Sequence, residues 1–314
     1  MIAYTIRRLL MLIPVLFGIS IFIFLIMKMI PGDVVSTMLG TEATDESRSQ
    51  LEKQFGLNLP IYQQYYNWIS GVLVGDFGVS LRTGKPVLGD ILNRFTLTLE
   101  LTLLSAFLSW IIAIPLGIIA AIKRNTSTDF GVRIISLLGV SVPNFALATL
   151  LLLILSVFFS YYPPSSYVSL VEDPVKNLQM MILPSIVLGT AMAGAVMRMT
   201  RSTVLEVLRQ DFIRTIRAKG ASERVVIFNH ALKNAMIPIL TIIGMQIGVL
   251  LGGTVIIEQI FSLPGLGQMV LTAINQRDYP VVQGAVLFIA FVFVMINLIV
   301  DLLYSYLDPR ITYK

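Results

Sequence analysis

LLMLIPVLFGISIFIFLIM, residues 9–27, carries no charged side chain over the full length of a membrane crossing. An α-helix needs about 20 mainly apolar residues to cross a hydrocarbon core that is roughly 30 Å thick. A longer uncharged run that starts at Ile134 is cut by Pro163 and Pro164, so we place one span at about residues 134–160. Four further uncharged runs of comparable length lie at 101–122, 177–197, 234–257 and 279–300. The sequence therefore predicts an all-α integral membrane protein with six transmembrane helices.

The composition excludes the common soluble classes. Of the 314 residues, 56% are hydrophobic and only 13% are charged, whereas a soluble domain has about 25% charged residues. The chain has 0 cysteines and 1 histidine, so thiolate metal sites and histidine acid–base chemistry have almost no residues to use. We therefore expect no metal site and no catalytic residue.

The segment nearest to a nucleotide-binding motif is GVSLRTGKP, residues 78–86. The spacing between Gly78 and Gly84 is one residue too long for a phosphate-binding loop. Pro86 stands where that loop needs a Ser or Thr for Mg²⁺. We expect that the chain is not an enzyme and binds no cofactor of its own.

The distribution of Lys and Arg predicts the orientation in the membrane. With the N-terminus in the cytoplasm, the segments on the inner side hold 15 of the 23 cations and the outer segments hold 7. An excess of Lys and Arg marks cytoplasmic segments. Both termini are therefore predicted to be cytoplasmic, with a short tail at 307–314, and the basic charge needs no nucleic acid to explain it.

The segment between the first two spans is too long for a simple connector. Thr44 and the acidic residues after it predict a capped amphipathic helix, which Gly56 ends. Residues 61–73 hold three tyrosines and a tryptophan, which favours a helix at the membrane–water boundary. We divide the chain into residues 1–92, the first span with an extracytoplasmic cap, and 93–306, a core of five spans. A folded cap and a docking surface for an external partner are compatible interpretations.

A second long segment, residues 198–236, lies on the inner side and is rich in charge. The pattern predicts a helix over Asp211–Lys219 that ends at Gly220 in a left-handed conformation. Ser222 is predicted to cap a second short helix through its hydroxyl; Val225 and Phe228 belong to its partly apolar face. Two interpretations carry equal weight: a protruding element that receives force from a soluble partner, or a loop that only anchors two spans.

Small and charged residues near the spans are further candidates. Gly244, Gly248 and Gly252 form one smooth helix face, which permits close helix packing or sliding against a partner. Glu100 and Glu258 lie near outer span ends, where they line an outward path or, as we favour, pair with an arginine such as Arg94. A proline- and glycine-rich turn beside them is interpreted as part of an outer gate and includes Phe261, Pro264, Gly265 and Gly267.

Eight sequence blocks occur in a defined order: IRRL (6–9), MIPGD (29–33), MRMTRS (197–202), DFIRTIRAKG (211–220), FSLPGLG (261–267), RDYPVVQG (277–284), NLIVDLLY (297–304) and DPR (308–310). Together they resemble the membrane permeases of binding-protein-dependent ABC importers, in the dipeptide, oligopeptide and nickel group. The resemblance covers nearly the whole chain. It implies a type I importer permease fold and a cytoplasmic coupling loop, known as the EAA motif.

The coupling loop departs from the general family pattern at two places. Arg214-Thr215-Ile216 occupies the position of Glu-Ala-Ala, and Leu232-Lys233 stands where Leu-Pro is usual, whereas Gly220 matches. Ion pairs of the general motif's glutamate are therefore not transferred. The loop residues that the resemblance implicates in coupling are Asp211, Arg214, Arg217, Ala218, Lys219, Gly220, Ser222 and Leu232.

The resemblance implies a permease subunit in the bacterial or archaeal cytoplasmic membrane that forms half of a pathway for di- or oligopeptides. Its implied partners are a second permease, two ATPase subunits that bind ATP and Mg²⁺, an extracytoplasmic solute-binding protein and membrane lipid. Nickel, glutathione or another small solute is an alternative cargo. A stand-alone channel or secondary transporter is the alternative of a different class; it needs mid-membrane ionisable residues or an inverted repeat, and neither is evident.

Overall fold

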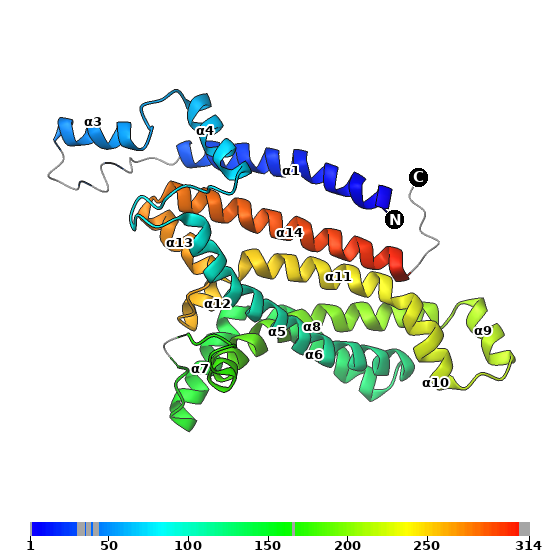
Figure 1. The fold of residues 1–314 in the computed structure, drawn as a ribbon. Helices are drawn as coiled ribbons and strands as arrows, with labels where there is room; N and C mark the ends of the chain where they lie inside the picture. The colour runs from blue at the N-terminus through cyan, green and yellow to red at the C-terminus, as the bar shows by residue number, and fades with distance from the viewer. Residues whose placement is uncertain (1, 30–34, 36–38, 40–43, 165–166, 308–314) are drawn as a thin grey trace. The chain divides into compact units, whose positions relative to one another are not determined.

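The structure is a computed structural model that describes residues 2–29, 35, 39, 44–164 and 167–307 (Figure 1). The predicted tail beyond residue 307 and most of the MIPGD block lie outside these residues. The chain forms two compact units. One comprises Leu99–Leu263 with Met295–Lys314, and the other comprises Ile2–Thr98 with Pro264–Val294.

The described residues contain five helical segments that are long and apolar enough to cross a membrane, or six if one bent pair of helices counts as a single span. This confirms the all-α membrane fold. The segments are α1 (Ile2–Met29), α5 (Val87–Ile122), α8 (Pro174–Val207), the continuous run Glu223–Gly252, α14 (Tyr279–Leu307) and the pair α6 (Ser127–Ser141) with α7 (Asn144–Phe159).

The bent pair corrects the predicted straight span at residues 134–160. Helices α6 and α7 meet at an angle of 99°, and the break lies at Val142 and Pro143. Val142 takes an extended conformation with ψ of 121°. Proline lacks an amide hydrogen and disfavours the helical conformation of the residue before it, so the helix cannot continue through this pair.

In the unit that comprises Ile2–Thr98 and Pro264–Val294, the two helices predicted between the first two spans are present. Helix α3 (Asp45–Gln54) begins at Thr44, which forms a capping box with Ser47. Helix α4 (Ile61–Leu73) has the predicted bounds, and Gly56 between the helices has φ of +66°.

Helix α4 lies against α1 (Figure 1), and aromatic side chains form the contact between them. The Tyr65 ring lies edge-on to Phe24, with centroids 5.3 Å apart, and its hydroxyl is 2.8 Å from the Ser20 hydroxyl. Trp68 stacks on Phe24, whereas Tyr62 stays 70% exposed. In the helix predicted for the membrane boundary, some aromatic side chains therefore contact α1 and others remain exposed.

The rest of this unit is joined by buried polar contacts. Asp278 is almost fully buried and accepts hydrogen bonds from the Ser80 hydroxyl at 2.5 Å and the Leu81 amide at 3.1 Å. Helix α13 (Leu266–Gln276) starts where the Leu266 amide donates to the Thr98 hydroxyl at 2.8 Å. These contacts fix the segment before α5 against the start of α14, and α13 against α5.

In the other unit, α8 is the central helix and small residues allow its neighbours to approach. A Cβ on Gly189 would lie 2.9 Å from the Ser105 carbonyl of α5, and one on Gly117 of α5 would lie 2.6 Å from Thr200 of α8. A Cβ on Gly139 of α6 would lie 2.9 Å from the α8 carbonyl of Thr190. Helix packing in membranes relies on such small residues. Ser105 of α5 lies beside Gly189 of α8, and Gly117 lies beside Thr200, so α5 and α8 run parallel to each other.

Candidate functional site

The candidate site is the charged segment that follows α8, the coupling loop predicted from the sequence. Helix α9 (Asp211–Ala218) has almost the predicted bounds. Gly220 follows with φ of +83°, and a Cβ there would meet nothing within 4 Å. The Ala221 amide donates to the Ile216 carbonyl at 3.4 Å across this turn. Gly220 is therefore required for its backbone conformation rather than for space.

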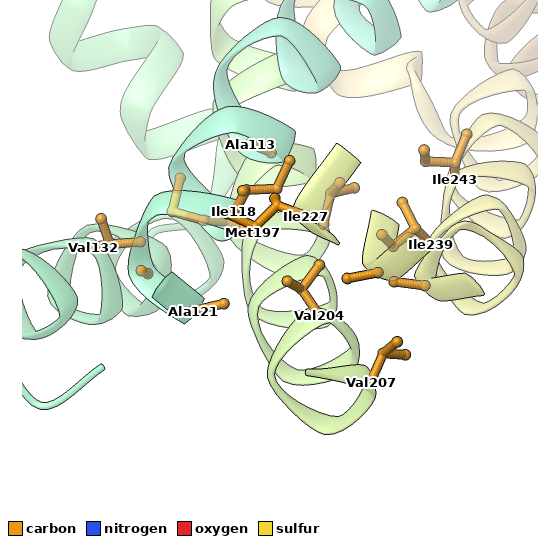
Figure 2. Packing of buried hydrophobic residues seen from close by; sticks show 14 of the residues in the cluster. Ala113, Ile118, Ala121, Val132, Met197, Val204, Val207, Ile227, Ile239 and Ile243 are labelled. Atoms are coloured by element: carbon orange, nitrogen blue, oxygen red, sulfur yellow. The ribbon is translucent and has the colours of Figure 1, made fainter. Parts of the chain in front are cut away.

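Two isoleucines fix α9 to the helical core: the buried Ile213 and the partly buried Ile216, which packs against the same cluster. Ile213 has no exposed surface and belongs to a cluster of buried residues from α5, α6, α8 and the helices that follow α9. Figure 2 shows Val204 and Val207 of α8 in this cluster together with Ile227 and Ile239. A displacement of α9 is thus resisted by the packing of α8 and of the segment after α9.

The remaining face of α9 is open and charged. The side chains of Asp211 and Arg214 are 94% and 78% exposed and form a long 3.4 Å contact. Arg217 donates two hydrogen bonds to Glu223, at 2.7 and 3.1 Å, across the Gly220 turn. These bonds raise the pKa of the Arg217 guanidinium. Ala218 and Lys219 are exposed as well. This face is available to a partner, and its turn is held by a bidentate ion pair.

Two details of the predicted second helix are wrong. Ser222 stands at the start of α10 (Glu223–Val225), but its hydroxyl makes no capping hydrogen bond; its carbonyl accepts from the Val226 amide instead. The predicted second helix is also not an element separate from the fifth span. It continues through a π-helical stretch, η2 (Val226–Ala231), into α11 (Leu232–Gly253).

The π-helical stretch explains why the predicted apolar face is divided. A π-helix has a wider turn than an α-helix and shifts the residues that face the core. Val226 and Ile227 are buried, whereas Val225 and Phe228 are 38% and 51% exposed. With Arg224 and Asn229, the two exposed side chains line a surface cavity of about 330 Å³. Leu232, by contrast, packs against the buried cluster.

The three glycines on α11 do not share one environment. A Cβ on Gly244 would overlap the Val300 side chain of α14, so this glycine permits packing within the chain. Gly248 is buried and Gly252 is exposed. Within the described residues, only the last of these three positions thus lies on an open surface.

The two glutamates make hydrogen bonds to neighbouring hydroxyl groups. Glu100 accepts from the Tyr167 hydroxyl at 3.0 Å. Burial, followed by the nearby Glu100 charge, raises the pKa of Tyr167 to about 12. Glu258 is fully buried in α12 (Val255–Ile260) and accepts from the Thr254 hydroxyl at 2.8 Å. The Glu258 contact lies within four residues, whereas the Glu100 contact joins residues 67 positions apart. Each hydrogen bond offsets part of the cost of burying a carboxylate.

The turn after α12 is largely buried. Phe261 is 3% exposed, and Gly265 and Gly267 are buried while Pro264 is half-buried. Gly265 directly precedes α13 with φ of −85°, so its conformation does not require glycine. A role of this turn as a gate stays a prediction.

The structure reveals one buried helix face and one ion pair that the sequence-based predictions do not include. Ile213 and Ile216 lie three residues apart on α9, a helical spacing that already indicates one buried face. Asp129 is fully buried and accepts two hydrogen bonds from Arg201, at 2.6 and 2.8 Å. These two residues are 72 positions apart, so no local pattern points to their pairing.

Comparison with known proteins gives the family. Residues 113–313 match the binding-protein-dependent transport system inner membrane component, and residues 1–102 match the N-terminal model of the same transport systems. The dipeptide transport system permease protein DppB of Alkalihalophilus pseudofirmus is 44% identical over 100% of both chains. The oligopeptide transport system permease protein AppB of Bacillus subtilis is 42% identical and the glutathione transport system permease protein GsiC of Escherichia coli is 41% identical, again over 100% of both chains.

A solved structure supports the fold. The inward-facing MetNI methionine ABC transporter matches with a TM-score of 0.54 and 17% identity, over 69% of this chain and 96% of that chain. At 17% identity the match supports a shared fold only. Together with the family models and the full-length relatives, it accounts for the several apolar helices and the charged segment between them. The chain belongs to the family of binding-protein-dependent transport system inner membrane components and is a multi-pass membrane permease of the ABC importer class.

Proposed function

We propose that this permease forms one half of a translocation pathway for di- and oligopeptides, and that separate subunits drive it by hydrolysing ATP. The names of the relatives from Alkalihalophilus pseudofirmus and Bacillus subtilis support a peptide cargo. The observation that carries the proposal is the construction of α9: an open charged face on one side and the buried Ile213 on the other. Such a helix is suited to receive force and pass it to the spans.

The motion follows from this packing. When two ATPase subunits close on bound ATP and Mg²⁺, they displace α9 and the adjoining surface formed by Val225 and Phe228. Ile213 shares a cluster with α8 and α11, so these spans tilt with α9. The pathway between this permease and a second one then opens outward, and hydrolysis returns it to the inward state. The ATP chemistry belongs to the partners, and this chain binds neither nucleotide nor metal.

The helix pairings support a cytoplasmic position for α9. Gly117 of α5 lies near Thr200 of α8, and Asp129 of α6 pairs with Arg201 of α8. The end of α5, the start of α6 and the end of α8 therefore share one end of this unit. Cations gather there, at positions 123, 124, 133, 198 and 201. By the positive-inside rule we assign this end to the cytoplasm, and the distribution of Lys and Arg along the sequence supports the same side for both termini.

On the opposite side, the segment with α3 and α4 is proposed to form the extracytoplasmic cap. Its open aromatic side chains, Tyr62 and Tyr66, are about 70% exposed. They offer a surface to the solute-binding protein that delivers the peptide or to the lipid headgroup region, where tyrosine is favoured. No nucleic-acid role is needed for any part of the chain.

Glutathione is the second candidate cargo, because the relative from Escherichia coli is a glutathione permease of nearly the same similarity. The test is uptake into proteoliposomes that hold this permease with its partner permease, ATPases and binding protein. We expect ATP-dependent uptake of a labelled di- or oligopeptide that exceeds glutathione uptake and is lost when the ATPases are omitted. Peptide uptake or ATP hydrolysis by this chain alone would contradict the proposal.

A further inference from the structure

A cavity of about 430 Å³ lies between α6 and α8 and is separate from the coupling loop. It lies at the end of the unit where α6 begins and α8 approaches its end. Its lining combines three arginines with apolar side chains of two membrane helices: Arg133, Arg198 and Arg201, with Phe130, Ile134 and Leu137. Ser136 completes the wall.

The cavity carries an excess of positive charge. Arg201 donates two hydrogen bonds to the buried Asp129, which neutralises one cation and leaves its other N–H groups free for a ligand. Arg133 and Arg198 are exposed, and neither forms an ion pair with a side chain among the described residues. The Phe130 ring holds the Arg133 guanidinium 5.4 Å from its centre, which orients the charge.

The apolar part of the cavity follows from the register of α6. Val132 is buried and lies within the core cluster, as Figure 2 shows, and Ser136 is buried at the base of the cavity wall. Ile134 and Leu137 lie on the other flank and are both 58% exposed. The cavity therefore combines the charge of Arg133 with an apolar wall formed by Ile134 and Leu137, which lie one and four residues further along α6.

We infer that this cavity binds an anionic phospholipid, with the phosphate at the arginines and an acyl chain along Ile134 and Leu137. Guanidinium groups match phosphate oxygens in charge and geometry. Basic pockets between membrane helices on the cytoplasmic side bind anionic headgroups. The apolar wall favours a lipid over a soluble phosphate, and its position on spanning helices favours a lipid over an acidic protein surface. The inference goes beyond peptide transport and rests only on the membrane location and on the proposed orientation of this unit.

The test is native mass spectrometry of the transporter complex released from micelles and titrated with phosphatidylglycerol or phosphatidylcholine. The wild-type complex is expected to bind phosphatidylglycerol more tightly than phosphatidylcholine. Each of R133Q and R198Q is expected to weaken phosphatidylglycerol binding about fivefold, and the double variant about 30-fold. Phosphatidylcholine binding should not change. R124Q is the matched control, because Arg124 is an exposed cation just before α6 that does not line the cavity.

Four results would overturn the inference. These are equal affinity of the wild type for both lipids, unchanged phosphatidylglycerol binding in the double variant, equally tight binding of glycerol phosphate, and a loss of ATPase subunits while lipid binding persists. The last result would assign the arginines to an acidic protein partner. If the double variant fails to fold, the wild-type lipid preference and the single variants still decide the matter.

Discussion

At the scale of single residues, two positions in the coupling loop are constrained for different physical reasons. Ile213 is constrained by burial, because its whole side chain lies in the core. Gly220 is constrained by its positive φ, while the space around its Cα is open. A substitution should therefore act through packing at the first position and through backbone strain at the second.

Gly220→Ala and Gly220→Leu are expected to loosen α9 to the same extent. A side chain at positive φ costs about 1–2 kcal/mol, whatever its size. Amide hydrogen exchange in α9, measured in the complete complex, should rise about 5- to 30-fold in both variants, and ATP turnover should become partly uncoupled from uptake. Gly89→Leu is the control, since its Cβ also meets open space but its φ is not positive. A harmless alanine and a harmful leucine would show that size, not φ, is decisive.

The Asp129–Arg201 pair gives a second prediction at this scale. The Arg201 side chain is only 21% exposed, so Asp129→Asn leaves a largely buried cation without its partner. We expect a loss of about 3 kcal/mol in the free energy of unfolding. The double variant with Arg201→Gln should lose less than the sum of the single variants, by about 1–3 kcal/mol. Denaturant titration of the purified protein measures both values, and strictly additive losses would refute the coupling.

At the scale of elements, the close approach of α6 to α8 rests on glycine. Gly139→Leu places a side chain against the Thr190 carbonyl, which lies 2.9 Å from the new Cβ. We expect a loss of about 1–3 kcal/mol. Gly131→Leu on the same helix meets open space and should change the unfolding free energy little. Thermal unfolding in detergent compares the two; equal effects would mean that the helices do not depend on this contact.

Features of the fold that depend on neighbouring residues could be predicted from the sequence, whereas features that depend on tertiary contacts could not. The ends of α3 and α4 were predictable because Thr44, Gly56 and the aromatic run act locally. The bend at Pro143 was not, since proline alone does not separate a break from a tolerated position. Four other prolines remain inside continuous helices: Pro14, Pro115, Pro184 and Pro238.

The coupling site shows the same limit. Helix α9 and the turn at Gly220 could be predicted from local pattern and from the resemblance to the permease family. The exposure of Phe228 could not, because it follows from the wider turn of η2. The cavity at Arg133 and Arg198 also depends on two helices that are distant in the sequence, so only the structure brings these residues together.

At the scale of the whole molecule, the two ends of the spans are expected to face different compartments. The chain has 0 cysteines, so a single introduced cysteine reports its own side of the membrane. In intact cells an impermeant maleimide should label Tyr62→Cys in the cap and should not label Arg224→Cys beside α9 until the cells are permeabilised. Both native side chains are exposed, so accessibility does not limit the labelling. The reverse pattern would invert the proposed topology.

The central claim is that α9 transmits the work of the ATPases to the spans through Ile213. The most direct measurement is the number of peptides taken up per ATP hydrolysed by the complete transporter in proteoliposomes. Ile213→Ala removes a fully buried side chain, at a cost of about 2–5 kcal/mol in local packing. This variant is predicted to hydrolyse ATP while its peptide-to-ATP ratio falls at least fivefold. Phe212→Ala, at a position that is 37% exposed, should keep the ratio of the wild type. An unchanged ratio in a folded Ile213→Ala transporter would contradict the account.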